Sequence, residues 1–261
     1  MITLPKLDFA ELEKKLTSFL VSEIGKTGLK KAVLGLSGGL DSALVASLAA
    51  RALGKENVTG ILMPYKTSSV KSIEDALKVV ENTGINSLKI EISAVVDTFA
   101  ANNMTNPDFS RKGRLGNIMA RTRMITLFDF SAANGAIVLG TGNKSEIELG
   151  YFTMFGDGAS AINPIGSLYK TDIFKFARYL GLPASVIEKA PSADLFEGQT
   201  DEGEIGYSYI QMDPVIHAVS DLGMSEKEII REGVDEKLVR FVVCRINSMK
   251  YKRKVPIIAT I

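Results

Sequence analysis

The stretch Ser-Gly-Gly-Leu-Asp-Ser at residues 37–42 decides the fold of this 261-residue chain. An apolar run, Ala32 to Leu36, comes before it, and Ala43 to Leu53 follows with apolar residues at helical spacing. A strand, a glycine turn and a helix in this order form a phosphate-binding arrangement, because paired glycines let backbone N–H groups approach an anion closely. The two serines add hydroxyl donors. Asp41 would repel a bare phosphate, so the stretch predicts a phosphate site that also holds a divalent cation.

This stretch is not a Walker A loop, since no Lys follows its last glycine to reach the β- and γ-phosphates. A glycine pair alone could be a turn that only joins a strand to a helix, but the full hexapeptide in this context favours a functional loop. It resembles the PP-loop of the ATP pyrophosphatases. The resemblance implies cleavage of ATP between the α- and β-phosphates, adenylation of a carboxylate or carbonyl oxygen, and retention of pyrophosphate by the loop.

The composition of the chain limits its class. Hydrophobic residues make up 46% of it, enough for a large core, and the net charge of +1 indicates no general attraction to nucleic acid or to an anionic membrane. A single cysteine permits no internal disulfide, which favours a reducing compartment. The first ten residues lack the apolar core of a signal peptide, and no apolar run is long enough to span a membrane. We therefore expect a cytoplasmic globular protein with no nucleic-acid or membrane partner.

Predicted strands and helices alternate from residue 31 to residue 139, which indicates an α/β fold. The expected strands are 32–36, 58–63, 87–92 and 136–139, and the expected helices before and between them are 11–24, 43–53, 70–83, 95–102 and 114–133. This alternation predicts a three-layer, doubly wound sheet, mostly parallel, with helices on both faces. Ligands bind beyond the carboxyl ends of such strands, so the loops at 37–42 and 140–146 should meet at one edge.

The rest of the chain predicts further helices at 170–180, 207–220, 225–231 and 234–249, after a loop-like stretch at 150–164. Two polar segments, 103–113 and 192–206, are candidates for loops that order over the site. We find no internal repeat and no linker that divides the chain. The expectation is therefore one domain over residues 1–261, with additional C-terminal helices and without a glutaminase domain.

Eight short segments, taken together and in order, are similar to the NAD synthetase family in its short, ammonia-dependent form. They are Gly35–Ser42, Arg121–Met124, Gly140–Glu146, Gly150–Thr153, Phe155–Gly158, Ile162–Pro164, Lys189–Leu195 and Lys252–Pro256. The resemblance implies a PP-loop fold of the adenine nucleotide α-hydrolase type. It also implies a reaction in which the nicotinate carboxylate of deamido-NAD attacks the α-phosphorus of ATP, and ammonia then attacks the acyl adenylate to give NAD and AMP. Adenylation is needed because a free carboxylate offers ammonia only a poor leaving group.

The resemblance assigns residues to that reaction. Asp41 and Glu146 are the implied catalytic pair and the implied ligands of Mg²⁺, which prefers carboxylate and phosphate oxygens. ATP is the co-substrate, and its implied contacts are Gly35, Leu36, Ser37, Gly38, Gly39, Leu40, Asp41, Ser42, Thr141, Lys170 and Ser192. The implied deamido-NAD contacts are Arg121, Asp157, Tyr251 and Lys252. The family further implies a homodimer with the dinucleotide site near the subunit interface, to which the helix at 114–133 is the candidate contributor.

The chain departs from the family pattern at two positions. Met154 stands where many relatives have Lys, and Ala161 stands where many have Asp. Those polar residues contact deamido-NAD in such relatives, and neither apolar side chain supplies a charge or a hydrogen bond. Recognition of the dinucleotide on that side therefore needs other groups, for which Asp157, Ser160 and backbone groups are candidates.

Several assigned residues also have a purely structural interpretation. Arg121 and Arg123 could belong to a solvated helix face, and Lys170 could lie on the surface where a helix begins. Glu146 could be a first-turn charge favoured by the helix macrodipole. Asp201 could be an ordinary loop residue.

Two further residues predict no chemistry. His217 lies on an apolar helix face, which is typical of a structural histidine. Cys244 lies among apolar residues and is expected to be a small buried hydrophobic side chain rather than the nucleophile of an amidase. Free ammonia is therefore the expected nitrogen donor, unless a separate glutaminase supplies it.

Two other functions are alternatives. The chain could be a different PP-loop ATP pyrophosphatase, either GMP-synthetase-like or tRNA-modifying, although the segments at 140–146 and 189–195 argue against both. It could also be a non-catalytic module that binds adenine nucleotides. The presence of both Asp41 and Glu146 argues against a passive module, which needs no second magnesium ligand.

Overall fold

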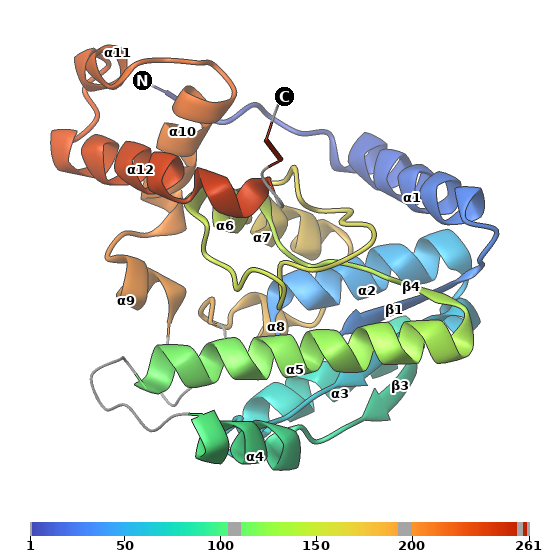
Figure 1. The fold of residues 1–261 in the computed structure, drawn as a ribbon. Coiled ribbons are helices and arrows are strands. Elements are labelled where there is room, and N and C mark those ends of the chain that lie inside the picture. Colours follow the sequence, from blue (N-terminus) through green and yellow to red (C-terminus); the bar gives the residue numbers. More distant parts are fainter. Residues whose placement is uncertain (1, 104–110, 193–199, 255–257, 260–261) are drawn as a thin grey trace.

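The computed structural model describes residues 2–103, 111–192, 200–254 and 258–259. Within them, β1 (Lys31–Gly35), β2 (Val58–Leu62), β3 (Asn86–Lys89) and β4 (Ala136–Val138) form one sheet in the order β3-β2-β1-β4 (Figure 1). The three strand pairs are all parallel, as predicted. The chain passes outward from β1 to β2 and β3 and then returns to place β4 on the other side of β1. The order of the strands therefore reverses at β1, and ligands bind at such switch points.

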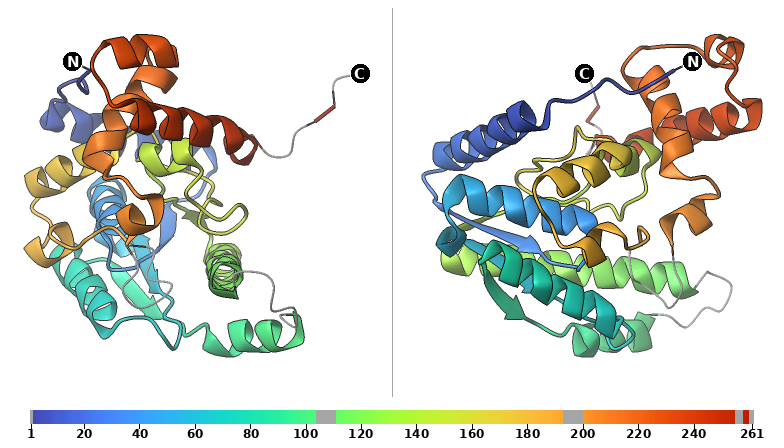
Figure 2. Two further views of the ribbon diagram at one scale, coloured as in Figure 1. Left: turned by 90° about the vertical axis from the view of Figure 1, so that its left-hand side faces the viewer. Right: turned by 180° about the vertical axis from the view of Figure 1, so that it is seen from behind.

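Helices cover both faces of the sheet (Figures 1 and 2). On one face lie α2 (Leu40–Leu53) and α3 (Val70–Thr83). On the other face α5 (Arg111–Asn134) packs against β1 and β4, with α4 (Ser93–Asn103) beside it. Outside α2 lie α1 (Phe9–Lys26) and α7 (Lys170–Tyr179). The predicted three-layer, doubly wound α/β fold is confirmed.

The helix α2 is apolar around its whole circumference because it is covered on every side. Leu40 and residues 42–49 are buried among the sheet, α1, α3 and α7. A helix that is hydrophobic all round belongs inside a core. This burial fixes the N-terminus of α2 beside the carboxyl end of β1, where the loop at 37–42 lies.

Local sequence signals place some element ends well and others less so. The predicted helix at 70–83 is α3 with the same bounds, because Ser69 caps its start and Gly84 ends it in the left-handed region at φ +70°. The predicted strand at 87–92 is the shorter β3. Beyond it, the backbone N–H of Ile90 still donates to the carbonyl of Leu62 at the end of β2, and that of Ile92 donates to the carbonyl of Pro64, so pairing continues past the regular strand.

The predicted C-terminal helices are present and pack together. The remaining elements are η1 (Lys55–Asn57), α6 (Lys144–Leu149), α8 (Ala184–Ile187), α9 (Asp201–Ile205), α10 (Tyr209–Ser220), α11 (Glu226–Arg231), α12 (Glu236–Ser248) and η2 (Lys250–Arg253). An apolar cluster separate from the sheet joins α6, α10, α11 and α12 and includes Tyr209, Met212, Ile216 and Val242. These helices therefore form a second wall next to the carboxyl edge of the sheet.

The structure confirms the interpretation of His217 and corrects that of Cys244. His217 is buried, and its Nδ1 lies 2.8 Å from Asp221 Oδ2. Cys244 is exposed, contrary to the prediction of a buried side chain. The buried face of α12 carries Val242 and Ile246, and Cys244 lies two residues from each, about 200° around the helix. The apolar residues near Cys244 in the sequence therefore do not indicate on which face of α12 the thiol lies.

The two segments predicted to order over the site lie partly outside the described residues. Of 103–113, residues 111–113 begin α5, and of 192–206, residues 201–205 form α9. The family-like positions 193–195, 255 and 256 also fall outside the description. In the part of the chain that the structure describes, no helix has the length and apolar character needed to cross a membrane.

Candidate active site

A cavity of about 930 Å³ opens beyond the carboxyl ends of β1, β2 and β4. Most of residues 35–42 and 150–160 line it, together with 61–64, 139–142 and 189–192. Residues of α3, α5, α6, α7, α9, α12 and η2 complete the lining. The loops at 37–42 and 140–146 meet here as predicted, and the volume suits a ligand of nucleotide size.

The loop at 37–42 turns the start of α2 toward the cavity. Gly39 is the N-cap of α2, and no side chain caps the helix there. The first N–H groups of the helix lack intrahelical partners, and the helix macrodipole adds partial positive charge at the same point. The hydroxyl oxygens of Ser37 and Ser42 lie 3.1 Å apart, and Ser42 Oγ donates to the Gly39 carbonyl over 3.0 Å. The loop therefore holds its own shape and favours an anion.

The two glycines of this loop have different positions. Gly39 lines the cavity, whereas Gly38 packs against the start of α3. Gly38 has φ +74°, and a Cβ atom there would lie 2.1 Å from the carbonyl oxygen of Ser72. Only glycine permits this approach.

Asn143 connects the two loops that carry carboxylates. Its Nδ2 donates to Asp41 Oδ1 over 3.0 Å, and its Oδ1 accepts from the N–H of Glu146 at 3.0 Å. Glu146 Oε2 in turn accepts from the N–H of Asn143 at 3.2 Å, which completes a capping box at the start of α6. Asn143 is fully buried. Asp41 and Glu146 are therefore held at one point through a single amide side chain.

Lys170, at the start of α7, lies between the two carboxylates. Its Nζ donates to Asp41 Oδ2 and lies 3.8 Å from Glu146 Oε1. The Lys170 side chain is only 3% exposed, which excludes the surface role considered from the sequence. Burial opposes its charge, but Asp41 and Glu146 raise the pKa of Lys170 above the ordinary lysine value. The ammonium group therefore stays charged and balances the carboxylates.

The surroundings of Glu146 disfavour its charged form. Burial, followed by repulsion from Asp41, raises the pKa of Glu146 to about 8, although Lys170 acts in the opposite direction. A divalent cation between these loops would relieve that repulsion. Among the described residues no three His, Cys, Asp or Glu side chains form a closed metal site. Two carboxylates completed by phosphate oxygens and water fit Mg²⁺, which retains several non-protein ligands.

The other residues assigned to ATP also line the cavity. Thr141 follows β4, and Ser192 follows the segment in which Lys189 Nζ donates to Ser72 Oγ over 2.8 Å. Gly35, Leu36 and Leu40 lie at the end of β1 and the start of α2 and contribute to the same lining. Of the eleven residues assigned to ATP, Gly38 alone is absent from the lining.

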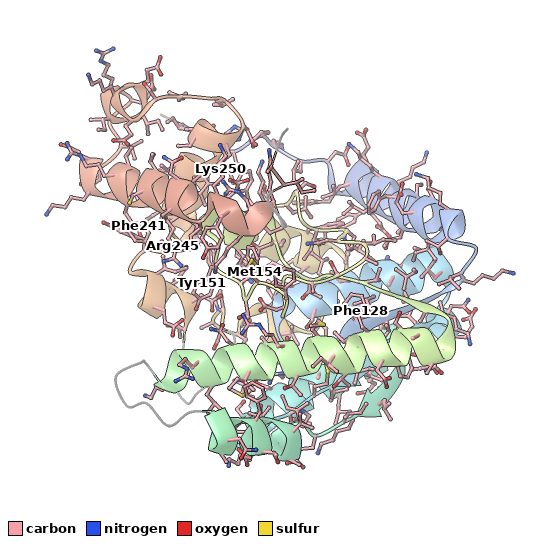
Figure 3. The ribbon with its side chains drawn as sticks, in the orientation of Figure 1. Phe128, Tyr151, Met154, Phe241, Arg245 and Lys250 are labelled. Atoms are coloured by element: carbon pink, nitrogen blue, oxygen red, sulfur yellow. The ribbon has the colours of Figure 1, made fainter. Side chains whose placement is uncertain are left out.

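The loop at 150–158, which carries Tyr151 and Met154, lies between α5 and the C-terminal helices (Figure 3). Lys252 Nζ donates to the carbonyls of Gly150 and Phe152, each at 2.8 Å. The Arg121 guanidinium donates to the carbonyl of Met154. These two cations therefore fix the backbone of the loop.

Asp157 and Tyr251 differ in their relation to the cavity. Asp157 accepts from the N–H of Thr153 at 2.9 Å and lines the cavity, and burial raises its pKa. Tyr251 is 48% exposed and is not a lining residue, and neither is Arg121. Phe155 has φ +59°, the one positive φ of a non-glycine residue in the described chain. The loop thus carries local backbone strain at the cavity rim.

Sequence reasoning missed the roles of Asn143 and Asp201. Asp201 is 4% exposed and lines the cavity, with Oδ2 accepting from the Tyr209 hydroxyl at 3.3 Å. It is therefore not an ordinary loop residue, and burial raises its pKa. The Asn-x-x-Glu pattern at 143–146 was a readable capping-box signal. No local signal shows that Asp201 is buried, because its partners come from α10 and the sheet edge.

Comparison with known proteins agrees with this geometry. The family model described as NAD synthase matches residues 12–256. The NH(3)-dependent NAD(+) synthetase of Chlorobaculum tepidum is 50% identical over 252 residues, which cover 97% of this chain and 90% of that protein. The structure of the NH3-dependent NAD synthetase of Campylobacter jejuni in complex with the nitrate ion has a TM-score of 0.81 at 35% identity, over 97% of this chain and 100% of that one. The structure of the NMN synthetase of Francisella tularensis has a TM-score of 0.87 at 32% identity, over 98% of this chain and 100% of that one.

The parallel sheet, the loop at 37–42 and the two carboxylates at its edge define a nucleotide-binding protein of the PP-loop class. With a family match over most of its length, the chain belongs to the NAD synthase family.

Proposed function

We propose that this protein amidates deamido-NAD to NAD with ATP and ammonia, through an acyl adenylate, and releases AMP and pyrophosphate. The observation that carries the proposal is the joining of Asp41 and Glu146, through Asn143 and Lys170, at the open N-terminus of α2. This places two carboxylates, a buried cation and backbone donors around one point of the cavity. The family relatives named NH(3)-dependent NAD(+) synthetase support the same reaction.

The chain's own groups suit the first half of the reaction. The N–H groups at the start of α2 and the hydroxyls of Ser37 and Ser42 bind phosphate oxygens and stabilise the charge that collects on departing pyrophosphate. Lys170, held charged by its neighbours, adds a fixed positive charge. Asp41 and Glu146 would hold Mg²⁺, which supplies charge neutralisation on the phosphates when bound. Phosphoryl transfer needs little covalent help, so this positioning accounts for most of the catalysis.

In the second half of the reaction ammonia attacks the acyl carbon, which must be held in position and shielded from water. The loop at 150–158, whose backbone Lys252 and Arg121 fix, lines one side of the cavity. Asp157 lines the cavity on this side and is our candidate for a direct contact with deamido-NAD. We assign Arg121, Tyr251 and Lys252 to the same substrate, with Lys252 the one of the three that lines the cavity. Ammonia requires no side-chain nucleophile, and exposed Cys244 is not needed as one.

We further propose a homodimer in which α5 contributes to the interface. Arg121, Ile125 and Phe128 recur at helical spacing on one face of α5. Ile125 is 61% exposed and Phe128 is 39% exposed, so this face presents apolar surface next to Arg121. The sequence-based expectations of a single domain over residues 1–261 and of a cytoplasmic location stay predictions.

One assay tests the proposed function. Purified protein is incubated with ATP, magnesium, ammonium and deamido-NAD, and NAD and AMP are measured in equal amounts if the proposal holds. ADP in place of AMP, or ATP cleavage that needs no acceptor, would contradict it. ¹⁸O in the nicotinate carboxylate should appear in AMP, because adenylation transfers that oxygen to the α-phosphate.

A second candidate acceptor is the mononucleotide, deamido-NMN. The observation in its favour is the close likeness to the structure named NMN synthetase, together with Met154 at a position where many relatives carry Lys. The same assay with deamido-NMN decides between the two by their kcat/KM values.

A further inference from the structure

Asp213 is a buried carboxylate to which the reaction above gives no role. It lies on α10, has no exposed surface, and both its oxygens are paired. Oδ1 accepts from Ser145 Oγ at 2.6 Å, and Oδ2 accepts from the N–H and the hydroxyl of Thr171 at 2.9 and 2.8 Å. Within the described ranges, two other buried acids, Asp75 and Asp201, each have one oxygen without a hydrogen-bond partner. The full set of hydrogen bonds therefore indicates that the Asp213 carboxylate has a specific structural role.

The donors to Asp213 come from the first turns of two helices. Ser145 is the second residue of α6, and Thr171 is the second residue of α7. The N-cap of α7 is Tyr169, which makes no side-chain cap hydrogen bond. Ser145 Oγ accepts from the N–H of Lys170 at 2.9 Å, and Asp213 accepts from the next N–H, so α10 and α6 together cap α7. The negative charge also lies where the macrodipole of α7 favours it.

Each of these donors is the chain neighbour of a residue at the catalytic point. Ser145 precedes Glu146, and Thr171 follows Lys170, whose Nζ lies 3.8 Å from Glu146 Oε1. One carboxylate from α10 thus fixes the distance between the elements that carry Glu146 and Lys170. We propose that Asp213 is a positioning residue that holds Glu146 and Lys170 in register for magnesium and ATP. The proposal depends on the proposed function only in naming magnesium and ATP as the ligands.

Binding of α,β-methylene-ATP, with and without magnesium, tests the proposal without turnover. Magnesium should raise the affinity of the wild-type protein for the analogue. In Asp213→Ala this gain should be smaller by about 10-fold or more, as is typical when a residue that supports metal ligands is lost. Asp213→Asn should restore most of that gain, since its Oδ1 can accept from Thr171 and its amide can donate to Ser145 Oγ. If Asp213→Ala does not fold, the milder double variant Ser145→Ala/Thr171→Val replaces it and should show the same loss.

Ile216→Ala is the matched control, since it opens a cavity on the same helix without touching these hydrogen bonds. It should lower the melting temperature and leave the magnesium gain at the wild-type value. A wild-type gain in Asp213→Ala, or in the double variant, would show that Asp213 only stabilises the fold. An equal loss in the Asn and Ala variants would also overturn the proposal, in favour of an effect of charge. A wild-type protein that binds the analogue with magnesium but makes no NAD would refute the proposed function and leave this test intact.

Discussion

Asn143 donates from Nδ2 to Asp41 Oδ1 over 3.0 Å, although 102 positions of sequence separate the two residues. The same side chain caps α6 through its Oδ1. One buried amide therefore sets both the start of a helix and the orientation of a carboxylate on another loop. This relationship makes the site a single unit rather than two loops that happen to meet.

Asn143→Ala should weaken both features. We expect a loss of about 1–3 kcal/mol in the free energy of unfolding, from the lost cap and the unpaired buried groups. We expect kcat to fall about 10–100-fold because Asp41 loses its supporting bond. Urea unfolding and steady-state assays measure the two effects, with exposed Asn134→Ala as the control. Turnover within twofold of wild type would show that Asn143 is only a cap.

Lys170→Met should leave the Asp41 carboxylate and its neighbour Glu146, both partly buried, without their nearby positive charge. Breaking a buried ion pair by removing one partner costs about 3–5 kcal/mol, so the variant should unfold at a much lower urea concentration. Magnesium should recover part of the loss, since it supplies charge to the same oxygens. Lys26→Met, which removes an exposed pair with Glu23, should change stability by less than about 1 kcal/mol. If magnesium does not stabilise Lys170→Met against urea, magnesium and the Lys170 ammonium group do not act on the same oxygens.

Gly38→Ala should be far more harmful than Gly181→Ala. Both glycines have positive φ, +74° and +73°, so both variants carry the backbone cost of roughly 1 kcal/mol. Only at Gly38 would the new methyl group meet a backbone oxygen, that of Ser72, while nothing lies within 4 Å at Gly181. Unfolding curves and ATP binding should therefore both suffer at position 38 and only stability at 181. Equal losses would mean that the loop relaxes away from α3.

Magnesium binding to the protein without ATP should release a proton near neutral pH. Burial and Asp41 raise the pKa of Glu146 to about 8, so Glu146 is largely protonated at pH 7 and must ionise to bind the metal. Magnesium affinity should then rise from pH 7 to pH 9. Calorimetry in two buffers of different ionisation enthalpy measures the proton released. No buffer dependence in the wild type, or an unchanged one in Glu146→Gln, would contradict the assignment.

Asp221 should contribute stability that acid removes. Burial alone would raise the pKa of Asp221, but bonds from Lys144, His217 and Tyr169 lower it to about 2. A lowered folded-state pKa stabilises the fold above the unfolded value near 4, and that contribution disappears as the pH falls toward 2. The stability difference between wild type and Asp221→Asn should therefore shrink from pH 5 to pH 2.5 in denaturant titrations. A difference that stays constant with pH would argue against this linkage.

The sequence predicted the sheet, its helices and the meeting of two loops because these depend on local patterns. Ser69 and Gly84 mark the ends of α3, and apolar runs mark the strands. What it missed depends on packing between distant segments. The burial of Lys170 requires α7 to be placed against α2 and α10, and the burial of Asp201 requires α9 at the sheet edge. Cys244 was misjudged because its apolar sequence neighbours lie on the other side of the helix.

The exposed position of Cys244 has a practical consequence. As the chain's single cysteine, it can take one maleimide dye or spin label at a defined place without any substitution. The next residue, Arg245, lines the cavity and donates to the carbonyl of Leu149 at the end of α6. A probe on this thiol would therefore lie one residue away from the cavity lining, at a place where its signal can be tested for a response to nucleotide on the native protein.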